Sequence, residues 1–181
     1  MNELYTSPTY EVRPPQTVDV PGLIELDIKA WQTGEGRRVP PFIADVEVSR
    51  LQSPEHRQDI ARDVVTYQGN SEVNPANEFW GVVVEGDAVV GSVKGSGTSA
   101  AVELVAIQVD PDYHSQGVAQ ELVSGFFDWA DSQHPGKDVF VSVDSRNEHA
   151  RAFYAKLGFQ AASSSSQLGG VLHLVRRAGT E

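Results

Sequence analysis

Three consecutive Val-rich segments near the middle of the chain constrain its fold more than any other feature. Segments 79–85 and 88–94 flank Gly86-Asp87, a dipeptide typical of two-residue turns between antiparallel strands. A third segment, Val102–Val109, reads VELVAIQV and stops before a proline. We therefore expect a β-hairpin followed by a third strand.

Four helices are predicted around these strands, three by apolar residues at helical spacing and one by its end signals. They cover residues 19–32, 54–67, 116–133 and 145–157. Ser145 to Glu148 has the form of a capping box, and Gly158 is placed to end the last helix. Segment 33–43 contains two glycines and two prolines, which predict a loop.

Four shorter segments complete the expected sheet. They are residues 10–13, 138–143, 159–162 and Val171–Arg176. The order of elements indicates an α/β (α+β) fold with one mixed sheet of about seven strands and helices on both faces. We expect one domain over residues 10–177, between an N-terminal tail (1–9) and a C-terminal tail (178–181).

The composition limits the kinds of site and compartment. The chain has 181 residues and no cysteine, which excludes disulfides and thiolate metal sites, and its histidines lack metal-ligand spacing. We therefore expect no metal. No apolar run approaches the roughly 18 residues that span a membrane, and the N-terminus does not read as a signal peptide. These features predict a cytoplasmic protein with no membrane partner.

The net charge of −11 bears on partners. It comes from 25 Asp and Glu against 14 Lys and Arg. Nucleic acid is a poor partner for such a surface, because its binding needs clustered cations. An acidic field favours cationic small molecules or basic peptides as partners, although solubility alone would also explain the charge. The sequence leaves a monomer and a homodimer both open.

The segment from Val109 to Ala119 carries the strongest chemical signal. It joins a strand to a helix, and the first N–H groups of a helix have no intrahelical partner and attract anions. Gly117 and Ala119 are small, so a diphosphate could approach the backbone closely. Taken alone, the segment is equally compatible with a plain connection between a strand and a helix.

The same segment resembles the coenzyme A-binding motif of the GNAT superfamily of N-acetyltransferases, V-x-P-x-x-(Gln/Arg)-x-x-G-x-(Gly/Ala). The residues in register are Val109, Pro111, Gly117 and Ala119. A second segment, from Asn147 to Phe159, is similar to that family's N-x-x-A-x-x-x-Y-x-K-x-G-F signature. The resemblance extends over residues 10–176 and is weakest between 33 and 77.

The resemblance implies that acetyl-CoA is the acyl donor. Its pantetheine arm would lie along Ile107, Gln108 and Val109, where strands Val102–Val109 and 138–143 splay apart. The other implied cofactor contacts are His114, Ser115, Gln116, Gly117, Val118, Ala119, Gln120, Asn147 and Tyr154. Tyr154 also matches the position of the family's general acid. A phenol stays protonated at neutral pH and can donate to a departing thiolate.

His114 departs from the family pattern, because it stands where Gln or Arg is usual. No Lys or Arg lies between Pro111 and Gln120, so the diphosphate would bind mainly to backbone N–H groups. A charged side chain at such a site adds roughly 1.5–3 kcal/mol. We therefore expect weaker coenzyme A affinity. A phosphate favours the protonated form of a nearby histidine, so His114 could recover part of this contact.

Glu103 is the best candidate for the base that deprotonates the amine. Alternation along the strand predicts Glu103, Val105, Ile107 and Val109 on one side. Burial inside this apolar run would make a carboxylate a stronger base. An exposed strand end is the alternative for Glu103, and Glu78 and Asp144 are weaker candidates for the same role.

Two functional interpretations remain open from the sequence. The first is an N-acetyltransferase in which an amine attacks acetyl-CoA directly, since the chain has no thiol for a covalent route. Its acceptor would be a small amine, an amino acid or a peptide amine. The second is a catalytically silent acyl-CoA-binding regulatory module. Loops 37–43 and 163–166 are the predicted sites of substrate specificity.

Overall fold

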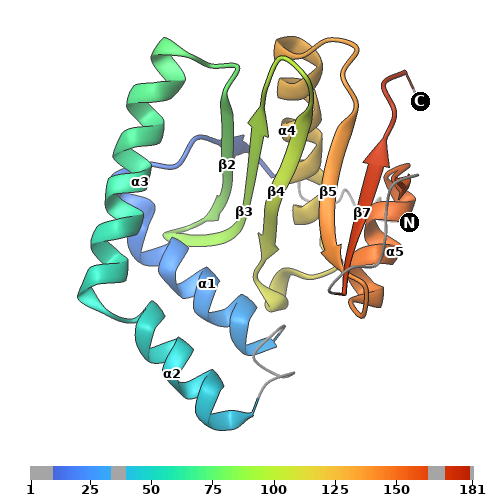
Figure 1. The fold of residues 1–181 in the computed structure, drawn as a ribbon. Coiled ribbons are helices and arrows are strands. Elements are labelled where there is room, and N and C mark those ends of the chain that lie inside the picture. The colour runs from blue at the N-terminus through green and yellow to red at the C-terminus, as the bar shows by residue number, and fades with distance from the viewer. Residues whose placement is uncertain (1–9, 34–39, 163–169, 180–181) are drawn as a thin grey trace, which may run out of the picture.

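The protein folds around one seven-stranded sheet, seen in a computed structural model that describes residues 10–33, 40–162 and 170–179 (Figure 1). The strand order is β1-β2-β3-β4-β5-β7-β6. The strands are β1 (Val12–Arg13), β2 (Glu78–Glu85), β3 (Ala88–Gly97), β4 (Val102–Val109), β5 (Val139–Asp144), β6 (Gln160–Ala161) and β7 (Val171–Arg176). The mixed sheet predicted from the sequence is confirmed.

The predicted hairpin forms β2 and β3. Glu85 pairs with Ala88 across the two-residue turn, where Gly86 has φ +60°. Such turns need a residue that tolerates positive φ, which glycine does without a Cβ penalty. β4 then pairs antiparallel with β3 and has the bounds expected from the sequence. This three-stranded centre supports the rest of the sheet.

β4 and β5 are the parallel pair of the sheet, and they stay together for only three residues. Val102, Glu103 and Leu104 pair with Val139, Phe140 and Val141. Beyond this point, β4 continues to Val109 and β5 to Asp144 without further pairing between them. The splayed parallel pair expected for the family is therefore present.

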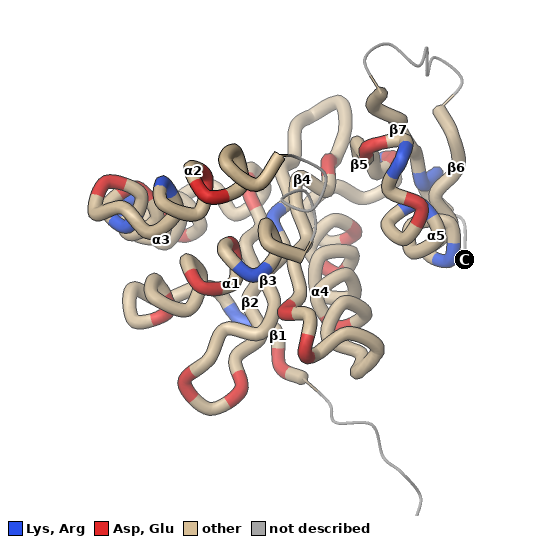
Figure 2. Tube along the Cα trace, turned by 90° about the horizontal axis from the view of Figure 1, so that it is seen from below, with Lys and Arg blue, Asp and Glu red and all other residues tan. Residues whose placement is uncertain are grey.

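Helices cover both faces of the sheet (Figures 1 and 2). α1 (Val20–Thr33), α2 (Pro41–Leu51) and α3 (Pro54–Val73) lie on one side, and α4 (Val118–Gln133) lies on the other. α5 (Glu148–Lys156) packs behind β7. Two short 3-10 helices, η1 (Thr17–Asp19) and η3 (Pro111–Tyr113), precede α1 and α4.

Two apolar clusters hold these layers together. One joins α4 and α5 to the sheet through side chains such as Phe126, Leu122 and Tyr154. The other joins α1 and α3 to the opposite face through Leu26, Val64 and Trp80. Both faces of the sheet are therefore packed against helices.

Three expectations about the elements are wrong in detail. Part of the predicted loop 33–43 is the start of α2, where Pro41 occupies the first helical position. Proline fits there because it has no N–H to leave unpaired. α3 runs to Val73 rather than residue 67. α5 is capped by Asn147, whose side chain accepts a hydrogen bond from Ala150 N at 3.1 Å, and not by Ser145.

Several predictions lie outside the described residues. These are the N-terminal tail 1–9, part of the first specificity loop (residues 37–39) and the second specificity loop 163–166. Within the described part of the chain, no helix is long and apolar enough to cross a membrane.

Candidate active site

A β-bulge in β4 lies at the point where β4 and β5 separate. In the ladder between β3 and β4, Lys94 pairs with Ala106 and Gly95 with Leu104, so Val105 is skipped. Val105 also follows the last β4 residue that pairs with β5. It is therefore unpaired on both sides, and the residue is 55% exposed. The bulge makes an accessible break in the middle of an otherwise covered sheet.

The bulge also changes which side chains share a face. Residues paired across an antiparallel ladder point to the same side. Leu104 and Ile107 pair with Gly95 and Val93, on the α4 side, where a Cβ at Gly95 would contact Phe126. The expected common face for Glu103, Val105, Ile107 and Val109 is therefore wrong. A bulge inserts one residue and inverts the alternation that follows it.

Glu103, Ala106 and Gln108 face the opposite side, toward α1 and α3, because they pair with Ser96, Lys94 and Ser92. Glu103 is exposed. The sequence had left open whether this carboxylate is buried in the apolar run or exposed, and the structure shows the exposed position. Glu103 pairs with Ser96 on β3, and Ser96 in turn pairs with Glu78 on β2. Asp144, the other weaker candidate, is ion-paired with Arg146 at 2.7 Å.

The start of α4 leaves several backbone N–H groups without a protein acceptor. Gly117 is the N-cap with φ +94°, no side chain caps the helix, and Ser115 also has a positive φ of 65°. Among the described residues, the amides of Gly117, Val118 and Ala119 donate to no protein group. A Cβ at Gly117 would meet nothing within 4 Å, so no protein group occupies the space beside this residue. This geometry suits an anion.

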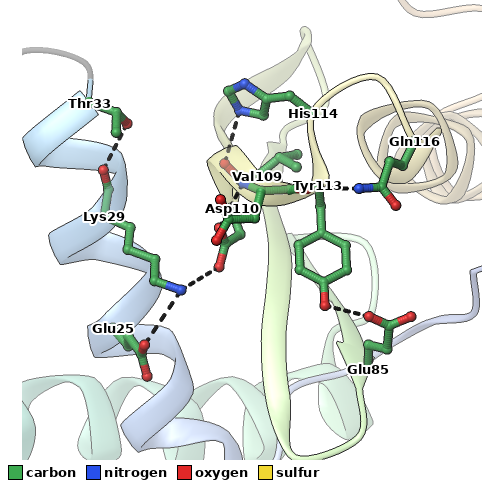
Figure 3. Close-up of polar contacts among 10 residues, drawn as sticks. Glu25, Lys29, Thr33, Glu85, Val109, Asp110, Tyr113, His114 and Gln116 are labelled. Carbon is green, nitrogen blue, oxygen red and sulfur yellow. Dashed lines mark hydrogen bonds and ion pairs between the residues drawn. The ribbon is translucent and has the colours of Figure 1, made fainter.

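Two side chains of the β4–α4 loop (residues 110–117), His114 and Gln116, contact nearby backbone carbonyls (Figure 3). Gln116 Nε2 donates to Asp112 O at 2.7 Å. His114 Nε2 lies 3.2 Å from Val109 O, at the end of β4. These contacts direct both side chains toward the loop and leave the α4 amides uncovered. Ile107, Gln108 and Val109 are half-buried, and Gln120 lies in the first turn of α4.

His149 is a neighbour of this loop that the sequence did not assign to the site. It lies in the first turn of α5, and its ring stacks on His114 with centroids 6.3 Å apart. This contact connects the loop that follows β4 with α5, the helix that follows β5. The signal was absent from the sequence, because His149 occupies an unspecified position of the second motif.

Tyr154 is 6% exposed on α5 and packs edge-on against Phe153 and Phe159. Its hydroxyl makes no hydrogen bond within the described part of the chain. Burial raises the pKa of Tyr154 to about 12. The phenol therefore keeps its proton well above neutral pH. Asn147, the other predicted residue of this motif, is the cap of the same helix.

A groove on the α3 side of the sheet reaches the bulge. It has a volume of about 310 Å³, and we call it the Trp80 groove. Its lining includes Tyr67, Trp80, Lys94 and Val105, with the carboxylates of Asp63 and Glu78 at the rim. The groove and the α4 N-terminus lie on opposite sides of the sheet, since Trp80 belongs to the α1–α3 cluster. Val105 is thus accessible from the groove.

An ion pair fixes the β4–α4 loop to α1 (Figure 3). Lys29 Nζ lies 2.7 Å from Asp110 Oδ2 and 3.5 Å from Glu25 Oε1. Burial acts to raise the pKa of the Asp110 carboxyl, but hydrogen bonds from Lys29 and the amide of Asp112 hold it below its ordinary value. Asp110 is therefore a charged anchor. The described residues contain no group of three side chains that could hold a metal ion.

Comparisons with known proteins agree with this geometry. Residues 45–159 match the family model "Acetyltransferase (GNAT) family". PaiA N-acetyltransferase from Thermoplasma acidophilum in complex with coenzyme A is 14% identical, with a TM-score of 0.76 over 94% of this chain and 99% of that one. An acetyltransferase from Thermus thermophilus is 17% identical, with a TM-score of 0.65 over 94% and 98%.

A third solved structure, YncA, a putative acetyltransferase from Salmonella typhimurium with its cofactor acetyl-CoA, is 15% identical. Its TM-score is 0.64 over 96% of each chain. At these identities the structural matches show a shared fold. No curated protein matches the chain.

Proposed function

Because the chain belongs to the acetyltransferase (GNAT) family, we propose that it moves an acetyl group from acetyl-CoA to a primary amine. The observation that carries the proposal is the break at Val105. Here β4 is unpaired on both sides. The Trp80 groove reaches this point from one face of the sheet, and α4 begins on the other face, after the end of β4. A donor and an acceptor could each reach this point without crossing the packed core.

The donor would bind along β4. After Leu104, the edge of β4 that faces β5 has no ladder partner, so its N–H and C=O groups can pair with the amides of pantetheine. The diphosphate would then accept hydrogen bonds from Gly117, Val118 and Ala119 at the start of α4. The names of two structural neighbours, one in complex with coenzyme A and one with acetyl-CoA, support this donor.

The transfer would be direct. The neutral amine attacks the thioester carbonyl carbon, the C–N bond forms, and the C–S bond breaks to release the thiolate of coenzyme A. Glu103, exposed on the acceptor side of β4, would take the proton from the amine, directly or through a water. Tyr154 would give a proton to the thiolate. The raised pKa of its phenol keeps that proton available at neutral pH.

The test is release of free thiol from acetyl-CoA in the presence of a panel of amines. We expect turnover with at least one primary amine and no release without an acceptor. Tyr154→Phe and Glu103→Gln should each lower kcat roughly 10²-fold or more, which is the usual contribution of a positioned acid or base. Unchanged turnover in both variants would contradict their assigned roles. Acetyl-CoA binding without turnover on any amine would favour the regulatory-module alternative.

A further inference from the structure

Lys94 is the cation of the Trp80 groove. It lies on β3, half-buried, between Trp80 on β2 and Ala106 on β4, which are its partners in the two ladders. Its Nζ lies 3.8 Å from the centroid of the Trp80 ring. Val105, at the break in β4, lines the same groove. A positive charge is therefore held in the same groove that Val105 lines.

This ammonium has no carboxylate partner within 4 Å among the residues that the structure describes. By contrast, Lys29 on α1 pairs with both Asp110 and Glu25. The ring face of Trp80 offers partial compensation of about 0.5–2 kcal/mol. A bound carboxylate would supply the charge-assisted hydrogen bond that Lys94 lacks. Lys94 is therefore a cation of the groove without an anionic partner among the described residues, and an anionic group of a ligand could pair with it.

The rest of the groove argues against a simple anion. The carboxylates of Asp63 and Glu78 lie at its rim, and Glu103 is exposed in the same row of the sheet as Glu78. A ligand with only negative charge would be repelled by these groups, and a ligand with only positive charge by Lys94. A molecule that carries an ammonium and a carboxylate together satisfies both.

We infer that the acceptor is an amino acid, whose carboxylate binds Lys94 while its amine faces Val105 and Glu103. The inference rests on the proposed function and narrows its acceptor. In an α-amino acid, the carboxylate and the amine are bonded to the same carbon atom. Lys94 and Val105 both line the Trp80 groove, whose volume is about 310 Å³. An amino acid whose carboxylate binds Lys94 therefore has its amine inside the groove that Val105 lines.

The experiment compares amine pairs that differ only in the carboxylate. The pairs are L-lysine with cadaverine, L-ornithine with putrescine, and L-phenylalanine with phenethylamine. Each is assayed by thiol release with wild type, Lys94→Met and Lys94→Arg. We expect wild type to prefer at least one amino acid over its decarboxylated partner in kcat/KM. Lys94→Met should lower kcat/KM for that amino acid roughly 10- to 100-fold. It should not lower kcat/KM for the decarboxylated partner, whose ammonium group Lys94 repels.

Lys94→Arg is the matched control, because it keeps the charge and the contact with Trp80. It should retain the preference, and Lys94→Gln serves in place of Lys94→Met if the latter does not fold. Equal turnover of both members of every pair by wild type would overturn the inference, as would an equal loss for both members in Lys94→Met. No turnover of any amine by wild type would instead overturn the proposed function itself.

Discussion

At the scale of single residues, the protonation and partners of Tyr154 define what it can do. Its ring is buried between Phe153 and Phe159, and its hydroxyl has no bonding partner within the described part of the chain. Removing that oxygen therefore leaves no protein group unsatisfied. Chemistry and stability can be separated at this position, which is uncommon for a buried polar residue.

Tyr154→Phe should leave the free energy of unfolding within about 0.5 kcal/mol of wild type while lowering kcat roughly 10²-fold. Urea unfolding and steady-state kinetics on one preparation check both values. In wild type, the pKa of about 12 predicts no loss of the acid as the pH rises from 7 to 10. A fall in kcat between pH 7 and 9 that Tyr154→Phe abolishes would contradict the pKa of about 12. A kcat that is unchanged in Tyr154→Phe would contradict the role as acid.

The sequence assigned residues to the candidate site by their motif positions, but it could not predict the environment of each residue. Gly117, Asn147 and Tyr154 could be placed because motif positions report which chemistry is present. The exposure of Glu103 could not, because it depends on the strands packed beside it. His149 was missed for the same reason, since only the fold brings the loop after β4 next to α5.

At the scale of elements, the bulge in β4 was the feature that the sequence could not reveal. The bounds of β4 follow from its apolar run and the proline after it, but VELVAIQV contains no glycine to mark an inserted residue. The pairing of β3 with β4 creates the bulge, and pairing is a property of two segments together. The sequence analysis did not predict α2 for a different reason. A proline such as Pro41 is compatible both with the start of a helix and with a loop.

The N-terminus of α4 can be tested with two matched glycines. Gly117 and Gly136 both have positive φ, +94° and +74°, and a Cβ at either meets nothing within 4 Å. Replacement of either glycine by alanine should lower the free energy of unfolding by about 1–2 kcal/mol, because the backbone would be strained. Only Gly117→Ala should weaken coenzyme A binding, roughly tenfold or more, because its methyl group enters the space for the diphosphate. Calorimetry would refute this if both variants lost affinity equally.

The ion pair between α1 and the β4–α4 loop predicts a pH-dependent contribution to stability. The pKa of Asp110 is lowered in the folded protein, so its stabilising effect is complete above about pH 4 and is lost as the pH falls further. Asp110→Asn should lower the free energy of unfolding by about 1–3 kcal/mol at pH 7 relative to wild type.

The difference between Asp110→Asn and wild type should shrink in urea unfolding at pH 3. Asp112→Asn, an exposed neighbour, is the control and should be nearly neutral at both pH values. A constant difference between pH 7 and pH 3 would show that the charge of Asp110 is not the source of its effect.

At the scale of the whole molecule, charge opposes the approach of the donor. The chain has a net charge of −11, and acidic residues are spread over the helices rather than confined to one (Figure 2). Coenzyme A carries several negative phosphate charges, so the two repel at long range. Salt screens this repulsion beyond about 10 Å at 0.1 M. The bound diphosphate, by contrast, depends on short-range backbone hydrogen bonds.

The association rate of coenzyme A should therefore increase as salt rises from 10 to 150 mM, while its dissociation rate changes little. Stopped-flow fluorescence measures both rates. Amino-acid acceptors without net charge should show almost no salt dependence of kcat/KM. A donor association rate that falls with salt would mean that cationic side chains, and not the α4 amides, dominate the encounter.

The central claim is that donor and acceptor meet at the break in β4 and react directly. Mass spectrometry after mixing the protein with isotopically labelled acetyl-CoA and an amino acid tests it most simply. The account predicts one labelled N-acetyl product for each free coenzyme A released, and an intact protein that carries no label. Label retained on the protein, or coenzyme A bound with no acetylated amine formed, would contradict it.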